Sequence, residues 1–148
     1  MPIALEQLDL SEFDLVISNE SGPAKGVITR SDALHICYCF SPMRYLWDMY
    51  PEYLKSSNSL IRLFMVPCFH YLRLWDVSTA NRVDYFLTIS HAVKARVKRW
   101  WKRDSEVLYP PVDLGRLEAT SDDGFVPPFG DEPYYVYLGA LVPYKRAD

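Results

Sequence analysis

The sequence has few of the features that would tie it to a secreted scaffold or a nucleic acid. Its 148 residues include three cysteines and carry a net charge of −3. An odd number of cysteines, behind an N-terminus that has Glu6 and Asp9 and no basic flank to an apolar core, argues against secretion. We therefore expect a reducing cytoplasm. The net negative charge excludes a general attraction to nucleic acid or to an acidic membrane.

Long apolar runs and internal repeats are also missing. The most apolar segment, residues 60–75, is too short and too charged to span a bilayer, because four residues interrupt it: Arg62, Pro67, His70 and Arg73. What is present is 49% hydrophobic and 24% charged residues, which is typical of a globular protein. The aromatic content of 15% suits a sugar or nucleotide cleft, but it suits a core or an interface equally well.

Strand and helix patterns alternate along the chain. Short β-branched or aromatic runs predict strands at residues 14–18, 34–39, 85–90, 106–109 and 134–138. Apolar residues at spacings of three and four predict helices at residues 43–54, 60–75 (kinked near Pro67) and 91–102. This alternation predicts an α/β protein with a doubly wound, Rossmann-like parallel sheet and helices on its faces. Residues 118–133 are rich in Asp, Gly, Pro and Ser and are expected to form a linker.

Two loops follow predicted strands at the edge where parallel sheets bind ligands. The first, Gly22-Pro-Ala-Lys25-Gly26, lacks the order of a Walker phosphate loop, and a turn with a solvated lysine is the simpler interpretation. The second begins at Phe40-Ser41, where Ser41 and Pro42 are expected to start a helix.

Metal binding and nucleophilic catalysis find little support. His35, Cys37 and Cys39 alternate along one predicted strand and share a face, but a zinc site usually needs four ligands, so we expect buried core residues. His70 is expected to be a core or helix-face histidine, and no Ser/His/Asp or Cys/His arrangement can be argued from spacing.

The predicted helix at residues 91–103 combines six cations with two tryptophans. Such a helix could lie on an anionic membrane surface or, less expectedly, on a nucleic-acid backbone. We favour a solvated face whose tryptophans pack onto the sheet. The residues are Lys94, Arg96, Lys98, Arg99, Trp100, Trp101, Lys102 and Arg103.

The last fifteen residues combine a strand pattern, a glycine turn and a cationic pair, Lys145-Arg146. A strand, a tight turn and a lysine before the next helix grip phosphate, because backbone N–H groups and a point charge converge on the anion. The chain stops there, which suggests a piece of a larger enzyme.

Several ordered segments together resemble retaining glycosyltransferases of the GT-B fold, in the family 4 group that includes mannosyltransferases of bacterial polysaccharide assembly. The segments are His35-Ile-Cys-Tyr-Cys-Phe-Ser-Pro-Met-Arg-Tyr-Leu-Trp-Asp48, Leu74-Trp-Asp76, Ala80-Asn-Arg-Val-Asp84, Val107-Leu-Tyr-Pro-Pro-Val-Asp113 and Gly139-Ala-Leu-Val-Pro-Tyr-Lys-Arg146. The resemblance implies an acceptor-side domain at residues 1–110. Residues 111–148 would be the linker and the start of a truncated nucleotide-sugar-binding domain.

The resemblance also implies site residues. Lys145, with Gly139 and Arg146, would hold the donor diphosphate, while Ala140 stands where the family has an arginine. Phe40 stands where the family has a histidine, and it can neither donate a hydrogen bond nor exchange a proton, so the catalytic residues stay unknown. The acceptor side of the cleft would be lined by Gly22, Lys25, Ser41 and Arg44.

These implications give one leading hypothesis and two alternatives. The leading one is a metal-independent glycosyltransferase without a cofactor, which moves a hexose, with mannose favoured, from a nucleotide sugar to a glycan or lipid-linked acceptor with retention. The first alternative is a non-catalytic, truncated or degenerate homologue, and we expect the 148-residue chain alone to be inactive. The second is a peripheral module at the inner face of the membrane, acting through the helix His91–Arg103. No nucleic-acid partner is expected.

Overall fold

The computed structural model describes residues 2–115 and, beyond them, residues 133, 135, 137 and 139. The chain divides after Pro110 into two compact units, Met1–Pro110 and Pro111–Asp148. All the strands and helices named below belong to the first unit. Ala140, Lys145, Arg146 and most of the predicted strand at residues 134–138 lie outside the described residues. The roles predicted for the two parts of the chain stay predictions.

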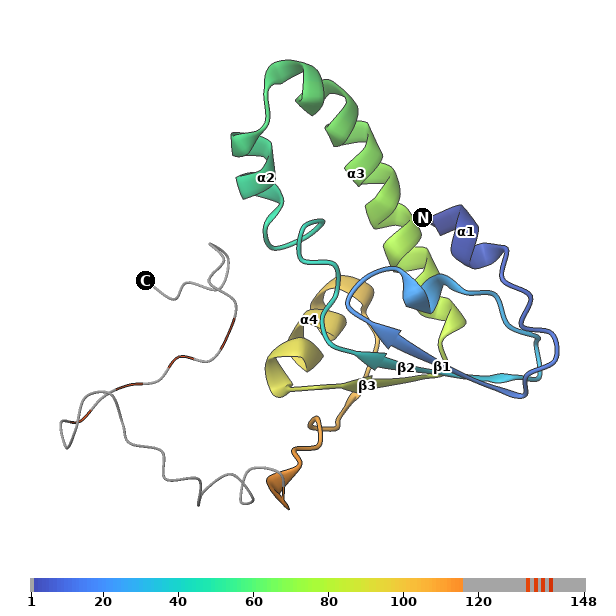
Figure 1. Ribbon diagram of the computed structural model, residues 1–148. Helices are drawn as coiled ribbons and strands as arrows, with labels where there is room; N and C mark the ends of the chain where they lie inside the picture. The colour runs from blue at the N-terminus through green and yellow to red at the C-terminus, as the bar shows by residue number, and fades with distance from the viewer. Residues whose placement is uncertain (1, 116–132, 134, 136, 138, 140–148) are drawn as a thin grey trace. The chain divides into compact units, whose positions relative to one another are not determined.

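A four-stranded sheet organises the first unit (Figure 1). Its strands are β1 (Leu15–Glu20), β2 (Leu34–Cys39), β3 (Tyr85–Thr88) and β4 (Glu106–Val107). They lie side by side in chain order, and every neighbouring pair is parallel. The predicted α/β class is therefore confirmed, with a helical crossover between β2 and β3 and another between β3 and β4.

The helices are α1 (Pro2–Glu6), α2 (Tyr50–Ser56), α3 (Ser59–Thr79) and α4 (His91–Trp101). Two of them begin at the side-chain cap that their sequences favour. The Asn58 side chain accepts a hydrogen bond from the Ile61 N–H at the start of α3, and the Ser90 hydroxyl accepts one from the Val93 N–H at the start of α4. Pro67 lies inside α3, and the helix continues past it to Thr79.

Several predicted boundaries are wrong, and two of them lie beside the loops that follow β1 and β2. Residues 44–49 form turns, so the predicted helix at residues 43–54 begins only at Tyr50. Ser41 does not cap it, because its hydroxyl donates to the Pro42 carbonyl at 2.9 Å. Strand β1 continues through Asn19 and Glu20, two residues beyond the predicted end at residue 18. Its pairing with β2 continues to this point, since the Glu20 carbonyl accepts the Phe40 N–H at 2.7 Å.

The core lies on one face of the sheet. Inward residues of β2 and β3, including Cys37, Cys39 and Phe86, pack against Val93, Val97 and Trp101 of α4. A second cluster joins Met43, Leu46 and Trp75. Along β2 and β3 the buried residues alternate with exposed or half-buried ones, as the two-residue period of a strand requires.

The opposite face of the sheet is open. Leu15, Ile17 and Tyr85 are 51%, 64% and 65% exposed, although parallel sheets are usually covered on both faces. Within the described residues the helices gather on one face, so the predicted two-sided covering is not seen there (Figure 1).

Helix α3 leaves the core along its first half. Leu60, Leu63 and Phe64 are each about 70% exposed, whereas Trp75 and Thr79 near the other end are buried. Figure 1 shows α2 and this end of α3 standing away from the sheet. No helix among the described residues is long and apolar enough to cross a membrane.

Candidate functional site

A buried ion cluster lies beyond the carboxyl end of β1. The strand ends at Glu20, and the chain then turns through Gly22 and Pro23 into a short 3-10 helix, Ala24–Gly26. This turn brings Lys25 back onto the strand end. The Lys25 backbone N–H donates to Glu20 Oε2 at 2.6 Å, and the Lys25 Nζ lies 3.3 Å from Glu20 Oε1. Asp76 of α3 supplies a second carboxylate to the same ammonium.

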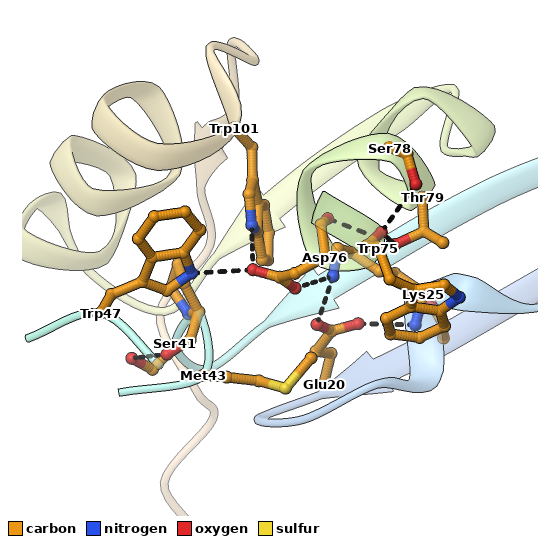
Figure 2. A network of polar contacts seen from close by, with 12 residues as sticks. Glu20, Lys25, Ser41, Met43, Trp47, Trp75, Asp76, Ser78, Thr79 and Trp101 are labelled. Atoms are coloured by element: carbon orange, nitrogen blue, oxygen red, sulfur yellow. Dashed lines mark hydrogen bonds and ion pairs between the residues drawn. The ribbon is translucent and has the colours of Figure 1, made fainter. Parts of the chain in front are cut away.

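The three charged side chains are fully buried. Figure 2 shows Glu20 and Asp76 on either side of the Lys25 ammonium. The interpretation of Lys25 as a solvated turn lysine is therefore wrong. Breaking one member of such a cluster leaves an uncompensated buried charge, which typically costs about 3–5 kcal/mol. The cluster thus fixes the loop after β1 to the C-terminal half of α3, 51 residues along the chain.

Tryptophans enclose the ion cluster. The indole N–H groups of Trp47 and Trp101 both donate to Asp76 Oδ2, each at 2.8 Å. The Lys25 ammonium lies 4.3 Å from the centre of the Trp101 ring, at a distance suited to a cation–π interaction. These contacts connect the loop after β2, which carries Trp47, to α3 and α4 (Figure 2).

The cluster holds one ammonium against two carboxylates, so full ionisation would leave a buried net negative charge. Burial raises the pKa of Glu20 to about 7, and the neighbouring Asp76 carboxylate adds to the rise, while Lys25 opposes it. Glu20 consequently takes up a proton near neutral pH, which removes its negative charge from the cluster.

A second set of contacts ties the same loop to the N-terminal helix. Trp75 lies directly against the α-carbon of Gly26, and its indole N–H donates to Glu6 Oε1 at 3.1 Å. Arg82 donates to the Gly26 carbonyl at 2.7 Å and pairs with Glu6 at 2.7 Å. The loop Gly22–Gly26 is therefore held from both sides by residues distant in sequence.

The residues considered for a metal site form part of the core. His35, Cys37 and Cys39 are fully buried, as predicted. One ring nitrogen of His35 lies 2.9 Å from the Ser18 hydroxyl and the other lies 3.2 Å from the Arg82 carbonyl. Burial lowers the pKa of His35 and raises the pKa of Cys37 to about 12, so both are held neutral. His70, by contrast, lies exposed on α3.

The structure places the predicted acceptor-side residues at the carboxyl edge of β1 and β2. Gly22 and Ser41 are half-buried, and a side chain at Gly22 would meet open space. Lys25 differs, because its ammonium is enclosed by the ion cluster and reaches no open surface. Phe40 packs on Tyr38 with the ring centres 5.3 Å apart. Of the predicted donor-side residues, Gly139 is described and lies beside the Tyr137 ring.

Among the predicted site residues, Arg44 has a side-chain N–H donor without an acceptor in the described part of the chain. Its Nε is buried and has no hydrogen-bond partner among the residues that the structure describes. A buried donor without an acceptor costs about 1–3 kcal/mol, so a ligand that accepts from this Nε would be favoured. Because Arg44 follows β2, it occupies the edge at which parallel sheets bind ligands.

Sequence reasoning missed the role of Glu20. It also missed that Asp76 binds both the Lys25 ammonium and the Trp47 indole N–H. A lysine between two small residues, directly after a strand that ends in glutamate, was the available signal. An aspartate within an otherwise apolar helix, next to Trp75, was a second one, since buried charges are almost always paired.

The cationic helix α4 has its tryptophans turned inward. Trp101 is buried, and Trp100 stacks on Trp47 with the ring centres 4.6 Å apart. Arg96 pairs with Asp48, and Arg103 donates to the Ala80 and Val83 carbonyls. Trp101 packs on Phe86 of the sheet, as expected, whereas Trp100 packs on the loop after β2. Membrane contact through α4 stays a prediction that rests on charge alone.

Comparison with protein-family models, with curated proteins and with solved structures finds no match for this chain.

Proposed function

We propose that this chain is the acceptor-side part of a retaining glycosyltransferase of the GT-B type, which moves a hexose, with mannose the first to test, from a nucleotide sugar to a glycan or lipid-linked acceptor. The observation that carries the proposal is that the sequence segments on which the resemblance rests contact one another. Trp47 of the first segment donates to Asp76 of the second. The backbone N–H of His35, in the first segment, donates to Asp84 Oδ2 of the third at 2.8 Å.

The geometry supports an acceptor-binding edge. In parallel sheets, ligands bind beyond the carboxyl ends of the strands, and the rigid ion cluster holds the loops after β1 and β2 at that place. Gly22, Ser41 and Arg44 lie on these loops. A preorganised edge of this kind can orient an acceptor, because its positioning groups are fixed before the ligand arrives.

In this proposal Lys145 stabilises the negative charge that develops on the leaving diphosphate. When the bond between the sugar and the diphosphate breaks, negative charge grows on the leaving group, and a fixed cation stabilises the transition state more than the ground state. Loss of one such group typically costs about 2.7–4 kcal/mol, or at least a hundredfold in rate. Arg44, with its unpaired Nε, is assigned to a phosphate on the acceptor side.

The test is donor-dependent sugar transfer by the full-length protein, with GDP-mannose and other nucleotide sugars and with a lipid-linked glycan as acceptor. We expect transfer with retention of the anomeric configuration, reduced at least a hundredfold in Lys145→Ala. Lys94→Ala, which changes an exposed cation on α4, is the matched control and is expected to keep the rate. An unchanged rate in Lys145→Ala would remove the assigned role.

A second candidate is a non-catalytic homologue, and Phe40 favours it. This side chain stands where the resemblance implies a histidine, and it packs on Tyr38 instead of presenting a proton donor. Calorimetry of the 148-residue chain with nucleotide sugars tests the second candidate. We expect no binding to this chain, and micromolar affinity would contradict an inert homologue.

A further inference from the structure

Helix α3 presents apolar side chains to solvent over about four turns. A surface helix usually turns such residues towards the core. The residues recur at intervals of three and four, so they share one face of the helix, and the leucines and aromatic residues among them are between 56% and 72% exposed. This face, here named the α3 stripe, consists of Leu60, Leu63, Phe64, Pro67, Tyr71 and Leu74. An exposed apolar surface of this kind marks an interaction site.

Polar contacts fix the turn that carries the exposed end of the stripe. The Arg62 side chain donates from Nε to the Leu54 carbonyl at 2.7 Å and from Nη2 to the Lys55 carbonyl at 3.3 Å. These carbonyls belong to the last turn of α2, so Arg62 ties α2 to α3. The Asn58 side chain caps the start of α3. The stripe is therefore held in one arrangement before any partner arrives.

The charged side chains of α3 are engaged by other segments. They are Arg62, Arg73 and Asp76. Arg73 donates to the Leu46 carbonyl at 2.8 Å and lies over the Tyr50 ring, and Asp76 is buried in the ion cluster. Helices that lie on anionic membranes use Lys and Arg beside their apolar face. Helix α3 has no such free cation, so its stripe suits a partner surface that is itself apolar and uncharged.

The stripe is symmetric about Pro67. Leu60 and Leu74 lie seven residues before and after it, and Leu63 and Tyr71 lie four residues before and after it. In a two-fold interface residue i of one copy contacts residue j of the other, and j contacts i. Two antiparallel copies of α3 that cross at Pro67 would therefore pair Leu60 with Leu74 and Leu63 with Tyr71. The stripe thus matches its own reverse, which favours a second copy of this chain as the occupant.

The available area is that of a weak dimer. Each large apolar side chain removes on the order of 100 Å² from water when it is buried. Five of them on each copy give on the order of 1,000 Å² for the pair, at the low end of specific protein interfaces. Phe64 would in addition meet His70, which lies three residues beyond Pro67 and is exposed. We therefore expect an association that depends on protein concentration.

We propose that two copies of this chain associate through the α3 stripe, with their α3 helices antiparallel and Pro67 on the two-fold axis. Intervals of three and four residues suit helices that cross at about 20°. The dimer is independent of the proposed glycosyl transfer, and its tests need neither donor nor acceptor.

The first test is sedimentation equilibrium of the full chain between about 1 and about 500 µM, the range in which a weak interface is partly occupied. We expect the average mass to rise from that of the monomer towards twice that mass. A mass that stays monomeric throughout, as expected if another part of this chain covers the stripe, would overturn the proposal. Flotation of such a monomer with phosphatidylcholine vesicles would instead assign the stripe to a bilayer.

The matched variants are Phe64→Lys and Val66→Lys. Both side chains are exposed on α3, but Phe64 belongs to the stripe, whereas residues two apart on a helix do not share a face. Phe64→Lys is expected to raise the dissociation constant of the dimer at least tenfold, because it places an unpaired cation in an apolar contact. Val66→Lys is expected to change it less than threefold. Equal effects of the two variants would show that the copies meet elsewhere.

The antiparallel register is tested by cross-linking with a short bismaleimide. Cysteine is introduced by Pro67→Cys or by Leu60→Cys, each combined with Cys68→Ser, since Cys37 and Cys39 are buried. On the two-fold axis residue 67 meets its own copy, while the two copies of residue 60 lie at opposite ends of the stripe. We expect covalent dimers to form at least tenfold faster with Pro67→Cys. Equal rates, as parallel helices or random collisions would give, would refute the proposed arrangement.

Discussion

At the scale of single residues, the most consequential feature is the fully buried side chain of Lys25. Lys25 contacts two carboxylates and an indole ring, and its ammonium and both carboxylates are fully buried. Buried ion clusters of this kind are weak evidence for high stability, because desolvation offsets much of the Coulomb attraction. What the Lys25 cluster supplies is position. It attaches the loop after β1 to α3 and, through the indoles that bind Asp76, to α4.

Glu20 makes stability depend on pH. Its pKa rises from 4.5 to about 7 on folding, so the folded state binds the proton more tightly, and the associated stability is present below about pH 4.5 and is lost as the pH rises to 7. A shift of this size corresponds to a loss on the order of 3 kcal/mol. Glu20→Gln keeps an acceptor for the Lys25 N–H and does not titrate.

The measurement is chemical unfolding of the wild type and Glu20→Gln between pH 4.5 and 8. We expect the free energy of unfolding of the wild type to fall relative to that of the variant as the pH rises. Comparing the two chains cancels the opposite contribution of His35, whose pKa is lowered by burial. Parallel pH profiles would show that Glu20 does not titrate in this range.

Gly26 is a second residue on which the loop depends. A β-carbon there would collide with the ring of Trp75, which is buried and held by Glu6, whereas a β-carbon at Gly22 would meet open space. Gly26→Ala is expected to lower the unfolding free energy by about 1–3 kcal/mol through overpacking. Gly22→Ala is expected to change it by less than about 1 kcal/mol. Equal effects in thermal unfolding would show that Trp75 can move away.

At the scale of elements, the helices differ in how much of the core they hold. Helix α4 buries Val93, Val97 and Trp101, while the first half of α3 is largely exposed. The N-terminal cap of α4 therefore supports the core, and the cap of α3 supports a segment that stands away from it (Figure 1).

The two caps give a matched pair of variants. Ser90→Ala removes the acceptor for the Val93 N–H and is expected to lower the global unfolding free energy by about 1 kcal/mol. Asn58→Ala removes the acceptor for the Ile61 N–H, but fraying of this exposed turn leaves the core intact, so we expect less than about half that loss. Urea unfolding measures both, and equal losses would mean that the first turns of α3 and α4 unfold together with the core.

The elements also show what the sequence could predict. Strand β2 and helices α3 and α4 were predicted because their periodicity agrees with their packing. The helix expected at residues 43–54 failed, since turns at residues 44–49 bring Trp47 to Asp76. No local pattern encodes that contact. For the same reason the loops after β1 and β2 could be placed from topology, while the ion cluster could not.

At the scale of the whole molecule, the described residues establish an α/β protein with one open, apolar sheet face. The proposed function lies at the carboxyl edge of β1 and β2, where the buried ion cluster joins the two loops that follow these strands. We propose that this edge receives the acceptor in a glycosyl transfer.

The most direct test is the KM for a lipid-linked acceptor in donor-dependent transfer by the full-length protein. Arg44→Ala removes the guanidinium at this edge, and Arg99→Ala removes one on the exposed side of α4. Loss of a charge-assisted hydrogen bond costs about 1.5–3 kcal/mol, so Arg44→Ala is predicted to raise the KM for the acceptor at least tenfold without changing the KM for the donor. Arg99→Ala is predicted to leave both unchanged. The same KM for the acceptor in the wild type and in Arg44→Ala would contradict the account.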